Sequence, residues 1–156
     1  MSNPLWEFSL ELYARPGVAA ACIAAQDRFA ADVNLLLYAA WLAQQGLELN
    51  RQQWQALAAS VAEWRRRVIQ PLRALRRDWQ DLPAAAALRE QVKMLELAAE
   101  QSQQAQMLAW HRLQEPQPAQ LNSLARALSE LLETSVGERD SGARGDLLRR
   151  LLSLLA

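Results

Sequence analysis

Three polar side chains interrupt the most apolar stretch of the sequence, residues 18–45: Asp27, Asp32 and Asn34. A carboxylate withdrawn from water is costly unless it is paired, so such groups often mark a ligand or metal site. If residues 18–45 form one helix, Asp27 and Asn34 are seven residues apart and share a face. The pattern is therefore compatible with a buried polar site in a helical enzyme or small-ligand protein.

The same residues also have a structural interpretation, which we favour. Asp32 can cap a helix that starts at Val33, after a loop or kink at residues 28–31. Asp27 can pair with Arg15 or with another arginine of the chain.

Other catalytic or metal-binding patterns are not found in the sequence. Cys22 and His111 are the only residues of their types, which is too few for a zinc site of the usual spacing. No Glu-x-x-His pair, Gly-rich phosphate loop or nucleophile elbow is present. A single cysteine cannot form an internal disulfide, which fits a reducing cytosol. We therefore expect no metal, no cofactor and no catalytic residues.

Arginines are the second chemical feature. Six of them lie between residues 63 and 81, and Glu63, Asp78 and Asp81 reduce their net charge to +3. They accompany an apolar stripe at steps of three or four, which predicts an amphipathic helix with its Trp and Leu side buried. The stripe consists of Trp54, Leu57, Val61, Trp64, Val68, Leu72, Leu75 and Trp79.

Three interpretations of these arginines stay open. They can form a solvated helix face whose stems cover apolar surface. They can bind the phosphates of RNA or DNA, although a net charge of +3 is modest for that role. They can also bind an acidic protein partner or pair within the chain. Arg66, Arg73 and Arg77 lie opposite the stripe, so we expect them to form the partner-binding surface.

The elements that position these residues are predicted to be helices. The 156 residues fit one domain and are rich in Ala, Leu, Gln, Glu and Arg, which are good helix formers, and poor in Gly and Pro. We expect an all-α, single-domain bundle of five to seven helices. The expected helices span residues 4–14, 18–45, 50–81, 83–114, 119–136 and 147–155, with 18–45 in the centre.

Pro71 falls inside the helix over residues 50–81 and predicts a kink there. The step from Val68 to Leu72 is four and the step from Leu72 to Leu75 is three. The stripe therefore keeps its phase across Pro71, which favours one kinked helix.

In the next helix, one buried face is predicted, and further apolar residues widen it. The face consists of Leu88, Val92, Leu95, Ala99, Ser102 and Ala109, and the residues that widen it are Met94, Leu97, Leu108 and Leu113. Residues 100–106 are polar almost all round, so we expect them to project past the core or to contact another chain.

The C-terminal part is expected to be an appendage of the same domain. We place the helical core domain at residues 1–115 and the appendage at residues 119–156, after a linker at residues 116–118. Residues 137–145 read as a polar loop, and Asp146 as the cap of the last helix. A homo-oligomer could form through these leucine-rich C-terminal helices.

Five segments form a distinctive combination: LWEFSLELY (5–13), PGVA (16–19), QD (26–27), DVNLLLY (32–38) and WRRRVIQPLRALRR (64–77). Read together, they resemble a family of small bacterial helical proteins of unknown function. The family pattern tends to place a glycine between the QD segment (26–27) and the DVNLLLY segment (32–38), where this chain has Ala30 and Ala31. This difference favours a more continuous helix there. The resemblance implies a bacterial cytoplasmic protein and supplies no activity.

Charge and hydropathy limit the environments that suit the chain. Acidic and basic residues balance at 17 each, so no global field attracts nucleic acid or membranes. The longest apolar run, residues 35–43, is too short to span a bilayer. We expect a cytoplasmic, non-enzymatic interaction or regulatory protein, with a protein partner and no membrane span. The alternatives are RNA or DNA binding by the arginine face and a helical enzyme using Asp27, Asp32 and Asn34.

Overall fold

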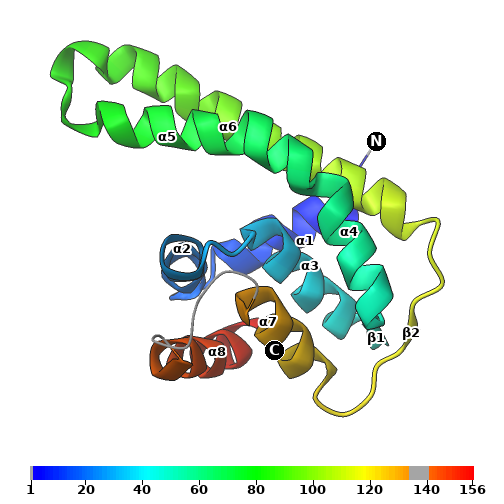
Figure 1. Cartoon of the computed structure of the whole chain (residues 1–156). Coiled ribbons are helices and arrows are strands. Elements are labelled where there is room, and N and C mark those ends of the chain that lie inside the picture. Colours follow the sequence, from blue (N-terminus) through cyan, green and yellow to red (C-terminus); the bar gives the residue numbers. More distant parts are fainter. Residues whose placement is uncertain (1, 134–140) are drawn as a thin grey trace. The chain divides into compact units, whose positions relative to one another are not determined.

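The computed structural model describes residues 2–133 and 141–156, and it is all-α apart from one two-residue strand pair (Figure 1). Counting α4, the π-helical turn and α5 as one kinked helix, the described residues form seven helices. The predicted fold class is therefore confirmed. The α-helices are α1 (Pro4–Tyr13), α2 (Val18–Phe29), α3 (Val33–Gln44), α4 (Arg51–Trp64), α5 (Gln70–Asp78), α6 (Ala86–His111), α7 (Ser123–Glu133) and α8 (Ser141–Leu155).

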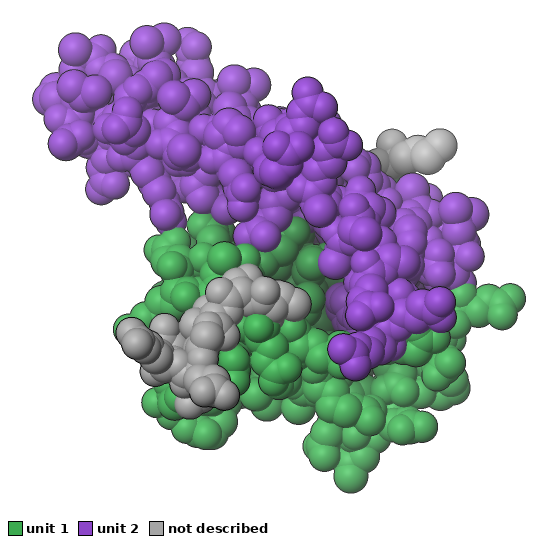
Figure 2. All heavy atoms as spheres, in the orientation of Figure 1, with its two compact units in different colours: residues 1–50, 115–156 green, residues 51–114 purple. Residues whose placement is uncertain are grey.

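The chain divides into two compact units (Figure 2). Unit 1 comprises residues 1–50 and 115–156, and unit 2 comprises residues 51–114. This division differs from the expected separation of residues 1–115 from residues 119–156, because α7 and α8 pack against α3 and α2 within unit 1.

Helix α3 is the centre of unit 1. Every residue from Asn34 to Leu42 is buried, and α1, α2 and α7 all pack against this helix. A helix that is apolar all round must be covered on all sides, which explains why this segment takes the central position. None of the described helices is long and apolar enough to cross a membrane.

The expected continuous helix over residues 18–45 was wrong, because the chain turns sharply between α2 and α3. Ala30 takes a left-handed conformation with φ 51°, and the Ala31 N–H donates to the Ala25 carbonyl at 3.2 Å. Asp32 then caps α3 by accepting from the Asn34 N–H at 3.0 Å. A left-handed alanine costs about 1–2 kcal/mol. Burial of Phe29 and Ala31 on either side of the turn offsets that cost.

A short antiparallel strand pair was not foreseen in the sequence. Strand β1 (Leu47–Glu48) follows Gly46, whose φ of 68° ends the preceding helix, and pairs with β2 (Gln117–Pro118), where a linker was expected. The Glu48 carboxylate also accepts from the Arg126 guanidinium at 3.1 Å. A strand of two residues is too short to show the alternation of apolar and polar residues by which strands are recognised in a sequence.

The C-terminal helix begins earlier than predicted. Residues 141–145 belong to α8, so the expected loop over 137–145 was wrong for this part, and residues 137–140 lie outside the described residues. Asp146 is inside the helix, where it pairs with Arg149, and does not cap it. Burial of Leu147, Leu151 and Leu155 along one face stabilises α8 despite its two glycines.

Unit 2 contains α4 and a long antiparallel hairpin of α5 and α6 (Figure 1). A π-helical turn (Arg65–Ile69) joins α4 to α5, with a change of direction, so the predicted kink is confirmed. The Gln70 N–H donates to the Arg65 carbonyl, five residues earlier. Pro71 explains the turn, because its ring would clash with the Arg67 carbonyl of a regular helix. Two 3₁₀ turns, Trp79–Asp81 and Pro83–Ala85, form the tip.

The π-helical turn inserts one extra residue and moves the inward face of the helix. Trp54, Leu57 and Val61 of the predicted stripe are buried, as expected. After the turn the inward face instead passes through Ile69 and Arg73, and Leu75 is 41% exposed. The expectation that the stripe keeps its phase across Pro71 was therefore wrong.

Helix α6 also differs from its predicted pattern. Three residues of the predicted face are buried as expected: Val92, Ala99 and Leu108. The other residues assigned to it are exposed, so this part of the prediction was wrong: Leu88, Met94, Leu95, Leu97, Ser102, Ala109 and Leu113. Residues 100–106 do not simply project into solvent, since the side chains at positions 103 and 104 are fully buried glutamines. Because residues 100–106 are almost all polar, the sequence did not predict that one face of this segment is buried.

Candidate functional site: the arginines of the α5–α6 hairpin

Arg73 and Arg76 face α6 and hold the hairpin together. Arg73 donates from Nε to Glu96 at 3.2 Å and from Nη2 to Glu100 at 3.2 Å. Arg76 reaches Glu96 through both Nε and Nη2, the latter at 3.2 Å. The Glu96 side chain is only 9% exposed. These four residues, which we call the Glu96 cluster, neutralise each other between the helices.

The Glu96 cluster corrects the expected partner-binding surface. Arg73 was expected to lie opposite the buried face, but its side chain is 14% exposed and is paired twice. The physical reason is the extra residue of the π-helical turn, which rotates Arg73 toward α6. Near the tip, Arg89 donates to the Arg76 carbonyl at 2.8 Å, which further ties α6 to α5.

Arg66 and Arg77, the other two expected residues, are exposed. Arg67, which follows Arg66, is also exposed and pairs with Glu63, four residues earlier, at 3.0 Å. Across unit 2 the sequence has ten arginines and lysines against six acidic residues, a net charge of +4. The rest of the chain has seven against eleven, a net charge of −4, so the neutral total conceals a strong asymmetry.

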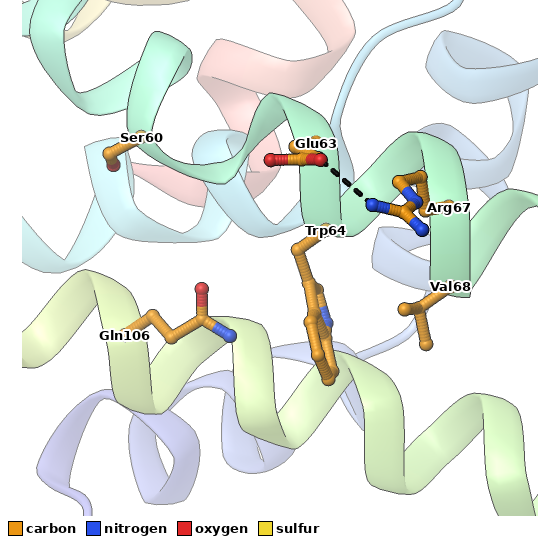
Figure 3. Close-up of a pocket in the computed structure, with 6 residues that line it drawn as sticks. All are labelled: Ser60, Glu63, Trp64, Arg67, Val68 and Gln106. Atoms are coloured by element: carbon orange, nitrogen blue, oxygen red, sulfur yellow. Dashed lines mark hydrogen bonds and ion pairs between the residues drawn. The ribbon is translucent and has the colours of Figure 1, made fainter.

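A surface depression of about 470 Å³ lies beside the π-helical turn (Figure 3). The Trp64 side chain points from α4 toward α6 and donates from Nε1 to the Ala99 carbonyl at 2.9 Å. The exposed Glu63–Arg67 pair borders the depression. The remaining lining residues are Ser60, Val68 and Gln106.

These side chains supply contacts and not covalent chemistry. The Ser60 hydroxyl donates to the Leu57 carbonyl at 2.7 Å, so its proton is directed into its own helix and not toward a base. An indole, an amide and an exposed ion pair around a shallow depression suit recognition of a surface.

Asp27, Asp32 and Asn34 differ in burial. Asp27 is exposed on α2, Asp32 is half-buried and caps α3, and Asn34 is buried in the first turn of α3. The break at Ala30 prevents Asp27 and Asn34 from sharing a helix face. In the described part of the chain, no group of three or more His, Cys, Asp or Glu side chains is placed to hold a metal ion.

Two groups with nucleophilic or acid–base potential have shifted pKa values. Burial raises the pKa of the Cys22 thiol to about 12, so this cysteine stays protonated at neutral pH and is a poor nucleophile. Burial, assisted by neighbouring Arg112, lowers the pKa of His111 below its ordinary value.

The comparisons with known proteins identify a family but no activity. The chain belongs to the family described as protein of unknown function (DUF2390), whose model matches residues 4–107. No curated protein and no solved structure matches the chain.

Proposed function

We propose that this member of a family without an assigned activity is a non-catalytic interaction protein of the bacterial cytoplasm, and that Arg66 and Arg77 bind an acidic segment of a partner protein. The observation that carries the proposal is the charge asymmetry. Unit 2 has a net charge of +4, and these two arginines remain exposed after the Glu96 cluster has neutralised Arg73 and Arg76.

Guanidinium chemistry supports a carboxylate-bearing partner. An arginine binds a carboxylate through two parallel N–H donors, as Arg76 does with Glu96 inside the hairpin. Arg66 and Arg77 are separated by roughly 16 Å of helix. Each exposed pair contributes at most about 1 kcal/mol, so binding needs further contacts. The depression at Trp64 supplies uncharged surface for them.

Charge reversal tests the proposal. The Arg66→Glu/Arg77→Glu variant should lose the acidic proteins that the immobilised wild-type protein captures at low salt. The Arg51→Glu/Arg112→Glu variant is the matched control, because both residues are exposed and both changes fall within unit 2. It removes the same charge and should keep the captured proteins. Equal loss in both variants, or no loss in either, would contradict a specific role for Arg66 and Arg77.

RNA or DNA binding by the same arginines is the second candidate, and the net charge of unit 2 is what favours it. It predicts a gel shift with any nucleic acid at low salt that weakens steeply as salt rises. Nuclease treatment of the captured material separates the two candidates, because it releases partners bound through nucleic acid and leaves directly bound proteins in place.

A further inference from the structure

The outward side of α6 carries a stripe without charge. Eight residues at helical spacing, all exposed, form what we call the α6 stripe. Met94 is 73% exposed, and Leu88 and Leu95 are each more than half exposed. The stripe consists of Ala87, Leu88, Gln91, Met94, Leu95, Ala98, Gln101 and Ser102.

The charged side chains of α6 all lie away from the α6 stripe. Between residues 87 and 102 there are five charged side chains, and all five lie off the stripe. An amphipathic helix normally turns its charged side to water and its apolar side to the core. Here Glu96 is buried in the hairpin while Met94 faces out. An exposed, uncharged surface that carries Leu88, Met94 and Leu95 is typical of a contact with another macromolecule.

We propose that the α6 stripe is the contact between two copies of this chain, which pair antiparallel, α6 against α6. A two-fold axis between Met94 and Leu95 places each stripe residue level with another stripe residue of the second copy. Met94 lies level with Leu95, Gln91 with Ala98, Leu88 with Gln101, and Ala87 with Ser102. The two hairpins then form a four-helix arrangement.

The composition of the stripe favours a second copy over an unrelated partner. In this register the apolar Met94 and Leu95 meet at the axis, Gln91 meets the small Ala98, Leu88 meets the stem of Gln101, and no two charges face each other. Such self-complementarity is what a two-fold interface requires. The absence of charge gives the stripe no electrostatic preference for an acidic or a basic partner. Arg66 and Arg77 lie on the α5 side, so this pairing is independent of the proposed binding of an acidic segment.

The size of the stripe predicts a weak dimer. It is roughly 22 Å long. Two such helices bury on the order of 1,000 Å² in total, which is at the lower end for specific interfaces. The two copies of unit 2 also repel each other at long range, because each has a net charge of +4. Dimerisation should therefore strengthen with salt, whereas binding of an acidic partner should weaken.

Sedimentation equilibrium of the full chain tests the pairing, from about 1 μM to about 200 μM and from about 50 mM to about 500 mM salt. The wild-type protein should form a dimer whose dissociation constant falls as salt rises. Met94→Glu/Leu95→Glu should stay monomeric at every concentration. Leu113→Glu/Leu121→Glu is the matched control, since both leucines are more than four-fifths exposed and lie off the stripe. It should dimerise like the wild type.

Engineered cysteines test the register. Gln91→Cys/Ala98→Cys should give a covalent dimer under mild oxidation, because residue 91 of one copy faces residue 98 of the other. Each single variant should not, because its own symmetry mate is roughly 10 Å away along the axis, beyond disulfide reach. The native Cys22 is buried and does not compete.

Several results would overturn the pairing. A wild-type chain that is monomeric throughout, or a Met94→Glu/Leu95→Glu variant that dimerises like the control, removes the α6 stripe as the interface. Cross-linking of either single cysteine variant as efficiently as the double variant removes the register. Loss of the dimer with unchanged capture of acidic proteins separates this inference from the proposed function.

Discussion

Replacing Glu96 by Gln should destabilise the hairpin severely while leaving its volume unchanged. The Glu96 carboxylate, 9% exposed, is the shared partner of Arg73 and Arg76. Glutamine keeps an acceptor oxygen but removes the negative charge, so two arginines are left facing each other between the helices. Arg73 retains Glu100 at 3.2 Å, whereas Arg76 loses the negative charge of the carboxylate that both its Nε and its Nη2 contact.

The expected loss follows from the burial of this cluster. Removing one member of a fully buried ion pair costs about 3–5 kcal/mol. The side chains of Arg73 and Arg76 are 14% and 25% exposed, and Arg73 keeps a second partner, so we expect about 2–3 kcal/mol here. For a chain of this length the melting temperature should fall by about 5–10 °C.

Urea unfolding followed by circular dichroism measures this loss. Glu90→Gln is the matched control, because Glu90 lies on the same helix but forms an exposed pair with Lys93. Its unfolding free energy should stay close to that of the wild type, because exposed ion pairs contribute little to stability. Replacing Arg73, Arg76 and Glu96 together by methionine should restore most of the stability, because the buried carboxylate and both arginines are removed together and the remaining Glu100 carboxylate is 30% exposed. A Glu96→Gln variant as stable as Glu90→Gln would refute the assignment of Glu96 as the central partner of the hairpin.

Three further predictions concern other parts of the chain. Ala30→Gly should stabilise the protein by about 0.5–1 kcal/mol in urea unfolding, because glycine adopts the left-handed conformation without the steric cost; Ala31→Gly, in the same turn, should not stabilise it. Cys22, with its pKa near 12, should react with iodoacetamide at pH about 8 only as fast as the native state opens, and alkylation at the rate of a free thiol would contradict its burial. His111 has its pKa held below 6.5 in the native state, so the unfolded chain takes up the proton first as the pH falls. The unfolding free energy should therefore be greatest above that pH and decrease below it, and a His111→Gln variant should lose this part of the pH dependence.

The fold was largely predictable because apolar residues recur in long helices every three or four positions, and this spacing can be recognised in the sequence. The bounds of α1 and the position of the central apolar segment follow from the spacing of leucines, and Asp32 was correctly proposed as a cap. The break at Ala30 was missed because alanine is a good helix former, and only the tertiary structure forces it into the left-handed region.

The candidate site was harder to predict, and a single residue explains why. Pro71 was recognised as a source of a kink, but a proline can be accommodated by a bend or by an inserted π-helical turn. The inserted π-helical turn rotates all later residues of the helix about its axis, so Arg73 faces inward and Leu75 faces outward. Helical spacing assumes a constant 3.6 residues per turn and cannot reveal such an insertion.

The α6 stripe was missed for a different reason. Leucines were assigned to the core because apolar residues usually lie there, yet Leu88 and Leu95 are exposed. The signal that could have identified the stripe was the placement of charge, since all charged side chains between residues 87 and 102 lie off it.

The strand pair of β1 and β2 makes the segment between them an insertion in unit 1. Leu47 pairs with Pro118 and Glu48 with Gln117, so the chain leaves and re-enters unit 1 through neighbouring strands about 5 Å apart. The entropy of closing such a loop rises only with the logarithm of its length, by about 0.6 kcal/mol per doubling. Whole turns can therefore be added to or removed from the tip of the α5–α6 hairpin at little cost to unit 1. The length of the α5–α6 hairpin can therefore change during evolution while the helices of unit 1 stay as they are.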